Sequence, residues 1–279
     1  MKRILVPTDF SDQAENALKV AAQLAKKYGS EIYLLHMLEL PLQLIDPSRS
    51  GSQNLPESMF FMKLAHQRFD EVMKRPYLEG VKVHETVEFH EAFEGIMEIS
   101  QQHRCDLIIM GSNGATGLKE VFIGSNTEKV VRHSEIPVLV IKNENANFHV
   151  YEFIFATDFT SKMREPFSEA VNLARKLDAK IHLVYINTAN KFKTSMYLEN
   201  IMSEFVEGLE FQNYTLNVHN DDSIEKGIVN FAERKNANLI GISTHGRKGL
   251  AHLLNGSLSE DLVNHVNMPV ITFKIPETS

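Results

Sequence analysis

The sequence predicts an α/β protein made of two tandem, doubly wound, Rossmann-like domains, each with a five-stranded parallel open sheet. Three observations support this prediction. Short apolar runs alternate with stretches of helical spacing, a glycine-rich stretch that follows an apolar run occurs twice, and the flanks of that stretch repeat with it. At 279 residues the chain is long enough for two domains of ordinary size.

The repeat can be followed at four places along the chain. Three of the four matches have an offset of 132 residues and the last has an offset of 149. They join Gly114 to Gly246, Gly124 to Gly256, 136–142 to 268–274, and 4–11 to 153–160. The repeat predicts a first domain over 1–143 and a second over 150–279, with the short polar stretch Asn143–His149 as the linker. The first domain contains 17 more residues before its glycine-rich stretch, and we assign them to an insertion over 39–56, rich in Pro, Ser and Gly.

In the first half the first helix has clear boundary signals. Ser11 can cap its start, apolar residues follow at helical spacing, and Gly29 ends it. The predicted strands are Lys2–Val6, Glu31–Leu38, Val81–Phe89, Cys105–Met110 and Pro137–Ile141, and the two further helices are 58–75 and Ala92–His103.

The second half repeats this alternation. The predicted strands are 152–157, 180–187, 213–219, 238–243 and 269–274, and the predicted helices are 162–177, 193–209, 223–235 and one that begins at Gly256. Strands that alternate with helices favour a parallel sheet with right-handed crossovers, in which ligands bind beyond the carboxyl ends of the strands.

Composition excludes several classes of protein. The formal net charge of −7 is spread over both halves as −3 and −4, so neither half is a basic nucleic-acid module. The single cysteine, Cys105, excludes an intramolecular disulfide framework and is expected to be a small buried residue. Neither a signal peptide nor a membrane helix is predicted. We therefore expect a cytoplasmic protein with no nucleic-acid or membrane partner.

The glycine-rich stretch 111–126 follows a buried strand and leads into a helix, an arrangement that suits a phosphate. Its spacing, G-x2-G-x9-G-S-N, is neither a P-loop nor G-x-G-x-x-G. Asp9, at the end of the first strand, can accept hydrogen bonds from an adenine amino group or a ribose hydroxyl, or hold a cation. The structural alternatives are that the glycines only form a turn and a helix start, and that Asp9 only caps a turn or helix.

These residues resemble the universal stress protein family. The resemblance rests on Pro7-Thr8-Asp9, on G-x2-G-x9-G-S-N and on the ending Ile136-Pro-Val-Leu-Val-Ile141, and it covers nearly the whole chain as two domains. It implies a nucleotide α-hydrolase-like fold that binds ATP or a related adenine nucleotide, usually with Mg²⁺. It also implies that the fifth strands, 136–142 and 268–274, pair within the chain as a pseudo-dimer.

Family roles carried onto this sequence give the expected ligand contacts. Adenine would contact Pro7, Asp9 and Met37; ribose and phosphates would contact Met110, Gly111 and Gly114; and terminal phosphates would contact Gly124, Ser125 and Asn126. The second half retains Asp158, Gly246, Gly256 and Ser257. It departs from the pattern at Ala156, Ser243 and Leu258, so we expect weaker or absent nucleotide binding there.

Other chemistry has little support. No histidine falls in a zinc-binding pattern, His84 and His90 are a weak metal candidate, and His36 is expected to pack near the pocket. His245, Arg247 and Lys248 suit either an anion or a solvated loop. No catalytic triad or P-loop lysine is present.

The leading hypothesis is a regulatory stress protein that binds an adenine nucleotide and is not an enzyme. The alternatives are slow ATP hydrolysis and a nucleotide-free interaction scaffold. The stress, the protein partner, the identity of the nucleotide and any homodimer remain open, as does the purpose of the insertion.

Overall fold

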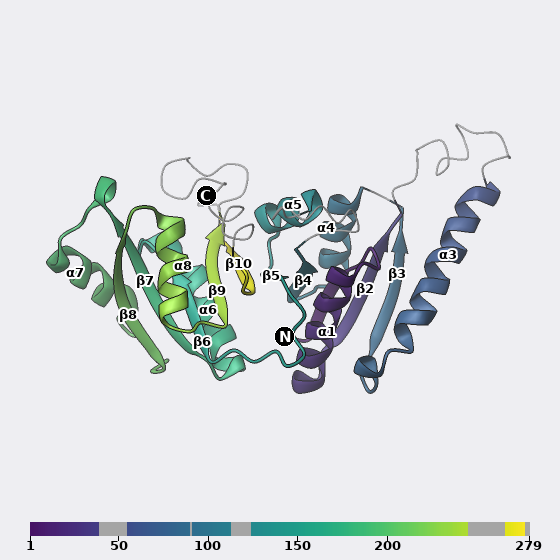
Figure 1. The fold of residues 1–279 in the computed structure, drawn as a ribbon, viewed down its shortest axis with the longest axis horizontal. Coiled ribbons are helices and arrows are strands. Elements are labelled where there is room, and N and C mark those ends of the chain that lie inside the picture. The colour runs from purple at the N-terminus through teal and green to yellow at the C-terminus, as the bar shows by residue number, and fades with distance from the viewer. Residues whose placement is uncertain (39–54, 90, 113–123, 245–265, 277–279) are drawn as a thin grey trace. The chain divides into compact units, whose positions relative to one another are not determined.

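The computed structural model describes residues 1–38, 55–89, 91–112, 124–244 and 266–276 (Figure 1). The chain divides into two compact units, which are described separately. Unit 1 contains residues 1–130 and 143–147, and unit 2 contains 131–142 and 148–279. No helix in the described part of the chain is long and apolar enough to cross a membrane.

Unit 1 has a parallel sheet in the order β3-β2-β1-β4. Its strands are β1 Arg3–Pro7, β2 Glu31–Met37, β3 Val83–Glu88 and β4 Leu107–Gly111. Its helices are α1 Asp12–Tyr28, α3 Leu55–Met73, the short 3₁₀ helix η1 Pro76–Leu78 and α4 Ala92–Gln102, and α5 Ser125–His133 begins in this unit. The predicted order of strands and helices is confirmed, with boundaries that differ by a few residues.

The boundaries of α1 follow the predicted signals. The Ser11 hydroxyl accepts a hydrogen bond from the Ala14 amide, and Gly29 ends the helix with φ at 65°, its amide donating to the Ala25 carbonyl. Gly29 has no Cβ to oppose this left-handed conformation. The buried face of α1 is largely alanine, and so the helix can lie close to β1 and β4.

The predicted linker is in part packed against α1. The Lys19 ammonium lies 2.6 Å from the Glu144 carboxylate, and the Gln23 amide donates to the Asn145 carbonyl at 2.9 Å. Lys19 holds the pKa of Glu144 below its usual value. Residues 143–147 therefore belong to unit 1 and are not an unattached spacer.

Unit 2 has a sheet in the order β5-β10-β9-β6-β7-β8. Its strands are β5 Val138–Ile141, β6 Glu152–Ala156, β7 Lys180–Thr188, β8 Tyr214–Asp221, β9 Leu239–Thr244 and β10 Val270–Lys274. Its helices are α6 Arg164–Leu177, α7 Ser195–Val206 and α8 Ile224–Arg234, with short 3₁₀ helices η2 Ser161–Met163 and η3 Ala189–Lys191. The helix predicted from Gly256 lies outside the described residues.

Strand β5 comes from the first sequence repeat but pairs with β10 of the second. The pairing is antiparallel, with Val140 opposite Val270. All the other pairings described in unit 2 are parallel. The pairing of the two fifth strands, expected from the family resemblance, is therefore confirmed, whereas the domain limits 1–143 and 150–279 stay a prediction.

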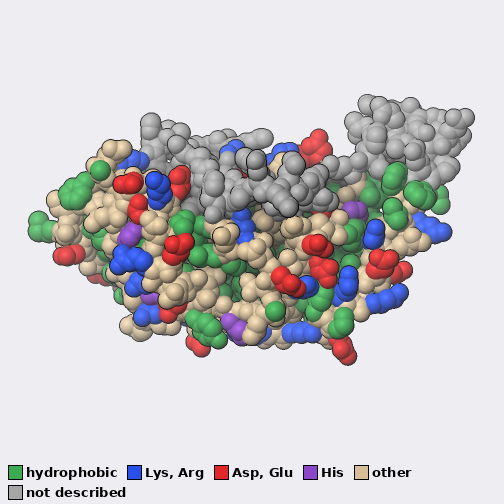
Figure 2. Space-filling view, in the orientation of Figure 1, with side chains coloured by type: hydrophobic (Ala, Val, Ile, Leu, Met, Phe, Trp, Pro, Cys, Tyr) green, Lys and Arg blue, Asp and Glu red, His purple; other side chains and the backbone are tan. Residues whose placement is uncertain are grey.

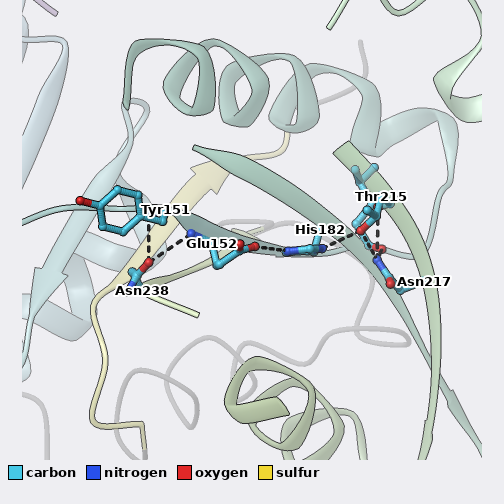
Figure 3. A network of polar contacts seen from close by, with 7 residues as sticks. Tyr151, Glu152, His182, Thr215, Asn217 and Asn238 are labelled. Atoms are coloured by element: carbon cyan, nitrogen blue, oxygen red, sulfur yellow. Dashed lines mark hydrogen bonds and ion pairs between the residues drawn. The ribbon is translucent and has the colours of Figure 1, made fainter. Parts of the chain in front are cut away.

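Matching side-chain anchors hold the first strand of each repeat. The Asp106 carboxylate accepts hydrogen bonds from the backbone amides of Lys2 and Arg3, at 2.5 and 2.9 Å. In unit 2 the Asn238 side-chain oxygen accepts from the backbone amides of Tyr151 and Glu152, at 2.9 and 3.1 Å (Figure 3). Both anchors therefore accept hydrogen bonds from two consecutive backbone amides, but the anchoring side chain is charged in unit 1 and neutral in unit 2.

A polar network crosses β6, β7 and β8 next to this anchor (Figure 3). His182 is only 3% exposed, and its Nε2 pairs with the Glu152 carboxylate while its Nδ1 lies 2.6 Å from the Thr215 hydroxyl. The Asn217 amide donates to the same hydroxyl at 2.8 Å. Both ring nitrogens of this buried histidine therefore have partners, and the network is a structural one.

Cys105 is buried beside the anchor of unit 1. Burial and the nearby Asp106 carboxylate raise the pKa of its thiol to about 11, so the thiol stays protonated at neutral pH. The interpretation of Cys105 as a small packed residue is confirmed.

Lys142 follows β5, and its burial is expected to make the effect of its removal depend on pH. Burial lowers the pKa of its ammonium to about 8, so the folded state binds this proton less tightly than the unfolded state does. The penalty is complete below pH 8 and fades as the pH rises toward the unfolded value near 10.4. The change in the free energy of unfolding caused by Lys142→Met should therefore be more favourable at pH 7 than at pH 10.5, by about 1–2 kcal/mol.

Urea unfolding at both pH values would measure this effect. The matched control is Lys274→Met, because Lys274 occupies the same position in the second repeat and lies 3.4 Å from the Glu135 carboxylate. That variant should not gain stability. An equal gain from Lys142→Met at both pH values would assign the effect to packing and contradict the charge argument.

Candidate functional site

The predicted ligand residues of unit 1 gather at the carboxyl ends of three adjacent strands. Strands β2 and β4 flank β1, with Pro7 opposite Leu35 and Leu5 opposite Ile108. Two residues further along β4, Met110 is level with Pro7. Pro7, Met37, Met110 and Gly111 therefore share one edge of the sheet.

Asp9 lies in the turn that joins β1 to α1. Its carboxylate accepts hydrogen bonds from the Ser11 amide at 3.0 Å and the Ser11 hydroxyl at 2.5 Å. The Thr8 hydroxyl accepts from the Phe10 amide at 3.0 Å. Asp9 thus organises the turn, as the structural alternative expected, and it is also exposed at the strand ends where a ligand can meet it.

Unit 2 builds the same turn. The Asp158 carboxylate accepts from the Thr160 amide and hydroxyl, at 3.0 and 2.8 Å, and the Thr157 hydroxyl accepts from the Phe159 amide at 3.1 Å. Phe10 and Phe159 have positive φ values of 62° and 59°, a conformation that an aromatic residue rarely adopts. The sequence analysis missed both residues, although the repeated Thr-Asp-Phe-Ser/Thr was a visible signal.

His36 fixes the turn of unit 1 from β2. Its Nδ1 donates to the Thr8 carbonyl at 2.8 Å, and its ring centroid lies 4.6 Å from that of Phe10. His36 lines a cavity beside the turn, so its expected position near a pocket is confirmed. In unit 2 the second strand has Tyr185 at this position.

The two ends of the glycine-rich stretch come together in unit 1. The Gly124 amide donates to the Ser112 carbonyl at 2.9 Å, and the Thr127 hydroxyl donates to the Gly111 carbonyl at 3.2 Å. Ser125 and Asn126 form the first turn of α5. The amino terminus of a helix therefore lies next to the end of β4.

Several predicted positions lie outside the described residues. They are Gly114, Gly246, Gly256 and Ser257, with Leu258 and the second-loop residues His245, Arg247 and Lys248, and also His90 of the weak metal candidate. Within the described ranges, no three His, Cys, Asp or Glu side chains form a cluster that could hold a metal ion.

Gly111 allows a close approach between β4 and α1. A Cβ at this position would lie 2.6 Å from the Gln13 carbonyl oxygen. Ser243 takes the corresponding position in unit 2, where it is 4% exposed and its hydroxyl has no hydrogen-bond partner within the described part of the chain. The second repeat therefore has a serine, Ser243, at a buried position where the first repeat has a glycine in close contact with α1.

Each unit has a cavity near its turn. The unit 1 cavity measures about 240 Å³ and is lined by Asp9, Phe10, His36, Leu38, Phe61, Leu64, Ala65 and Arg68. The unit 2 cavity measures about 60 Å³ and is mostly apolar, with four isoleucines among its lining residues. Its lining includes the repeat counterparts of Pro7, Asp9, Met37 and Met110, which are Ala156, Asp158, Ile186 and Ile242.

The unit 2 cavity is lined by one carboxylate, Asp158, and one ammonium, Lys191, beside apolar side chains. Burial and then the Asp158 carboxylate raise the pKa of Tyr185, which lines the same cavity. The four isoleucines, Ile186, Ile224, Ile228 and Ile242, provide no hydrogen bonds from their side chains.

On the face seen in Figure 2, basic and acidic side chains are interspersed.

Known proteins of similar sequence or structure share the fold described above. A universal stress protein of Archaeoglobus fulgidus has a solved structure that matches with a TM-score of 0.73 at 23% identity, covering 99% of this chain and 97% of that one. Universal stress protein Slr1230 of Synechocystis is 25% identical over 98% of this chain and 100% of its own length. Universal stress protein MJ0577 of Methanocaldococcus jannaschii is 35% identical over 52% of this chain and 97% of its own length.

The sequence profile of the universal stress protein family matches twice, at residues 1–142 and 152–274. These two matches coincide with the two halves of the internal repeat, and each contains one Thr-Asp-Phe turn. The chain therefore belongs to the universal stress protein family and contains two tandem copies of its domain.

Proposed function

We propose that the protein is a cytoplasmic regulatory stress protein that binds ATP or a related adenine nucleotide, mainly in the N-terminal domain. The observation that carries the proposal is the closure between the Gly124 amide and the Ser112 carbonyl. It holds the start of α5 beside Gly111 and near the Asp9 turn, so the groups that would meet the phosphates and the nucleoside share one edge of the sheet.

The chemistry of these groups suits a nucleotide. The first amides of α5 have no acceptor within their own helix, and the helix dipole favours an anion there. Asp9 can accept hydrogen bonds from a ribose hydroxyl or an amino group, and the neighbouring cavity has apolar walls. Mg²⁺ would be held mainly by the phosphate oxygens, since magnesium prefers oxygen ligands and keeps several waters.

Unit 2 is proposed as the weaker site. It retains the Asp158 turn, but Ser243 adds a side chain where Gly111 allows close packing. The cavity beside Asp158 is also smaller, at about 60 Å³ against about 240 Å³ for the cavity beside Asp9. Gly246, Gly256 and Ser257 would supply any phosphate contacts that remain.

We propose no catalytic residue. The sequence of neither glycine-rich stretch contains the lysine motif of a P-loop, and we expect nucleotide binding to act by changing contacts with a protein partner. Slow hydrolysis would appear as turnover above that of an Asp9→Ala control.

Isothermal titration of Mg²⁺-ATP tests the proposal. The wild type should bind close to one nucleotide per chain, and a Gly114→Val, Gly124→Val double variant should lose that binding, because two side chains would occupy the space needed by the phosphates. The matched control is Gly246→Val with Gly256→Val, which should leave the main binding event intact. A folded wild type that binds no ATP would contradict the proposal and favour the nucleotide-free scaffold.

A further inference from the structure

Strand β8 lies at the edge of the unit 2 sheet (Figure 1). No strand in the described part of the chain pairs with its outer side. On its inner side the Asn213 carbonyl accepts from the Ile181 amide at 3.0 Å, and alternate residues of a parallel strand face the same neighbour. The intervening residues of β8 therefore direct their amides and carbonyls away from β7, and these outward residues are Tyr214, Leu216, Val218 and Asn220.

Unit 1 protects the corresponding edge strand, β3, whereas unit 2 does not protect β8. Edge strands are usually protected by charged side chains or by a covering element. Strand β3 has Glu85 and Glu88, and burial and then the Asp70 carboxylate of α3 raise the pKa of Glu85. At the matching positions β8 has Leu216 and His219, so all the outward residues of β8 are uncharged.

Apolar side chains are exposed beside this edge. Val218 is 44% exposed, and it lies opposite Tyr185 of β7. Burial is the main cause of the raised pKa of Tyr185, and Tyr197 of α7 contributes to it, so Tyr197 lies near the same strand. Tyr197 is exposed, as are Phe192 and Met196 just before it. An apolar surface therefore continues from the edge of β8 to the start of α7.

A lysine is held at the carboxyl end of the β8 edge. The Asn187 side chain donates to the Asn220 side chain and to the Lys193 carbonyl, each at 3.2 Å, and accepts from the Lys193 amide at 2.9 Å. The Asp221 carboxylate, on the other face of the sheet, accepts from the Asn230 amide of α8 at 2.8 Å. Lys193 is therefore fixed beside Asn220, the last outward residue of the edge.

The amino end of β8 has an excess of negative charge. Glu207 and Glu210 are exposed in the segment that leads from α7 to β8. One basic side chain, Arg175, reaches this segment, where it lies 5.7 Å from the centre of the Phe211 ring. The two carboxylates outnumber it, so this end of the edge suits a basic side chain.

We propose that the outer edge of β8 pairs with β8 of a second copy of the chain, antiparallel about a twofold axis at Asn217. In this register the four outward residues of each copy pair with the four of the other. Leu216 lies opposite Val218, and Tyr214 lies opposite Asn220. The inference does not depend on nucleotide binding.

Self-complementarity favours a second copy over an extended segment of another protein. No like charges face one another along the paired strands, and the exposed Val218 gains an apolar neighbour. The twofold axis also brings Lys193 of each copy, fixed beside Asn220, to the end of the other copy that has Glu207 and Glu210.

Sedimentation equilibrium tests the pairing. Val218→Lys should raise the dissociation constant of the dimer at least about tenfold, because the apolar pair is lost and the two new ammonium groups become diagonal neighbours. Val218 is already exposed, so the variant should fold, and thermal unfolding would verify this. The matched control is Val87→Lys, at the same position of β3, which should change the dissociation constant by less than about twofold.

A cysteine at the axis tests the register. Directly opposite residues of a non-hydrogen-bonded antiparallel pair have Cα atoms about 4.5 Å apart, which is within the range of a disulfide. Asn217→Cys should therefore form a covalent dimer with diamide as the oxidant, and non-reducing electrophoresis would show it. Cys105 is buried, so the wild type should not be cross-linked. Thr86→Cys, at the same position of β3, is the matched control and should stay monomeric.

An exchange of charge tests the orientation of the two copies. Lys193→Glu and Glu210→Lys should each weaken the dimer by about threefold. A protein with both changes should regain most of the wild-type affinity, because the opposite charges face one another again.

Four outcomes would overturn the inference. A wild type that sediments as a monomer up to about 1 mM would leave the edge to a strand from another protein. Equal weakening by Val87→Lys and Val218→Lys would place the association elsewhere. An Asn217→Cys protein that is not cross-linked would reject the register. A doubly exchanged protein no tighter than the single variants would reject the antiparallel orientation.

Discussion

Replacing Phe69 with alanine should lower the free energy of unfolding of unit 1 by about 3–5 kcal/mol. The side chain is fully buried and packs edge-on against Phe10, whose backbone has a positive φ. Its loss leaves a cavity and removes a contact that holds Phe10 in its rare conformation. Urea denaturation followed by circular dichroism would measure the loss.

Two matched variants make this prediction specific. Phe205→Ala removes the corresponding contact with Phe159 and should cost unit 2 a similar amount. Leu64→Ala changes the same helix at a side chain that is 43% exposed, and it should cost less than about 1 kcal/mol. If Phe69→Ala cost no more than Leu64→Ala, the contact with Phe10 would not be what stabilises the turn.

Gly111→Ala should destabilise unit 1 by about 1–3 kcal/mol, which thermal or urea unfolding would show. The new Cβ would lie 2.6 Å from the Gln13 carbonyl oxygen and 2.7 Å from its carbon. Both atoms are backbone, so no side-chain rotation can relieve the overlap, and α1 or β4 must shift.

Ser243→Ala is the counterpart of this variant in unit 2. It removes a buried hydroxyl for which the described residues offer no hydrogen-bond partner, so stability should be unchanged or should rise by up to about 1 kcal/mol. A Gly111→Ala protein as stable as the wild type would show that α1 can move away from β4 at no cost.

Much of the fold was predictable because its signals are local. Ser11 and Gly29 mark the ends of α1 in the sequence, and both positions are confirmed as caps. Because the sequence repeats, the same order of strands and helices could be predicted for the second half. The order in the described residues agrees with that prediction. Apolar runs were sufficient to place the inner strands β1 and β4, which are buried, whereas 81–89 was placed by its alternating pattern.

The site was predictable only in outline. Asp9 and Gly111 were chosen from the sequence, but the positive φ of Phe10 and the hydrogen bond from His36 to the Thr8 carbonyl depend on contacts between separate strands. The assignment of residues 131–142 to unit 2 likewise depends on pairing with β10, which the first repeat alone does not specify.

The paired anchors at Asp106 and Asn238 limit how the duplicated halves can exchange sequence. Asp106 accepts from the backbone of a basic residue, Arg3, whereas Asn238 accepts from that of an acidic one, Glu152. Recombination that copied the aspartate onto position 238 would add a carboxylate at the backbone of Glu152, whose own carboxylate already pairs with His182. We therefore expect exchange between the two halves of the gene to be tolerated best when the segment carries both the anchor and the start of the strand that it holds.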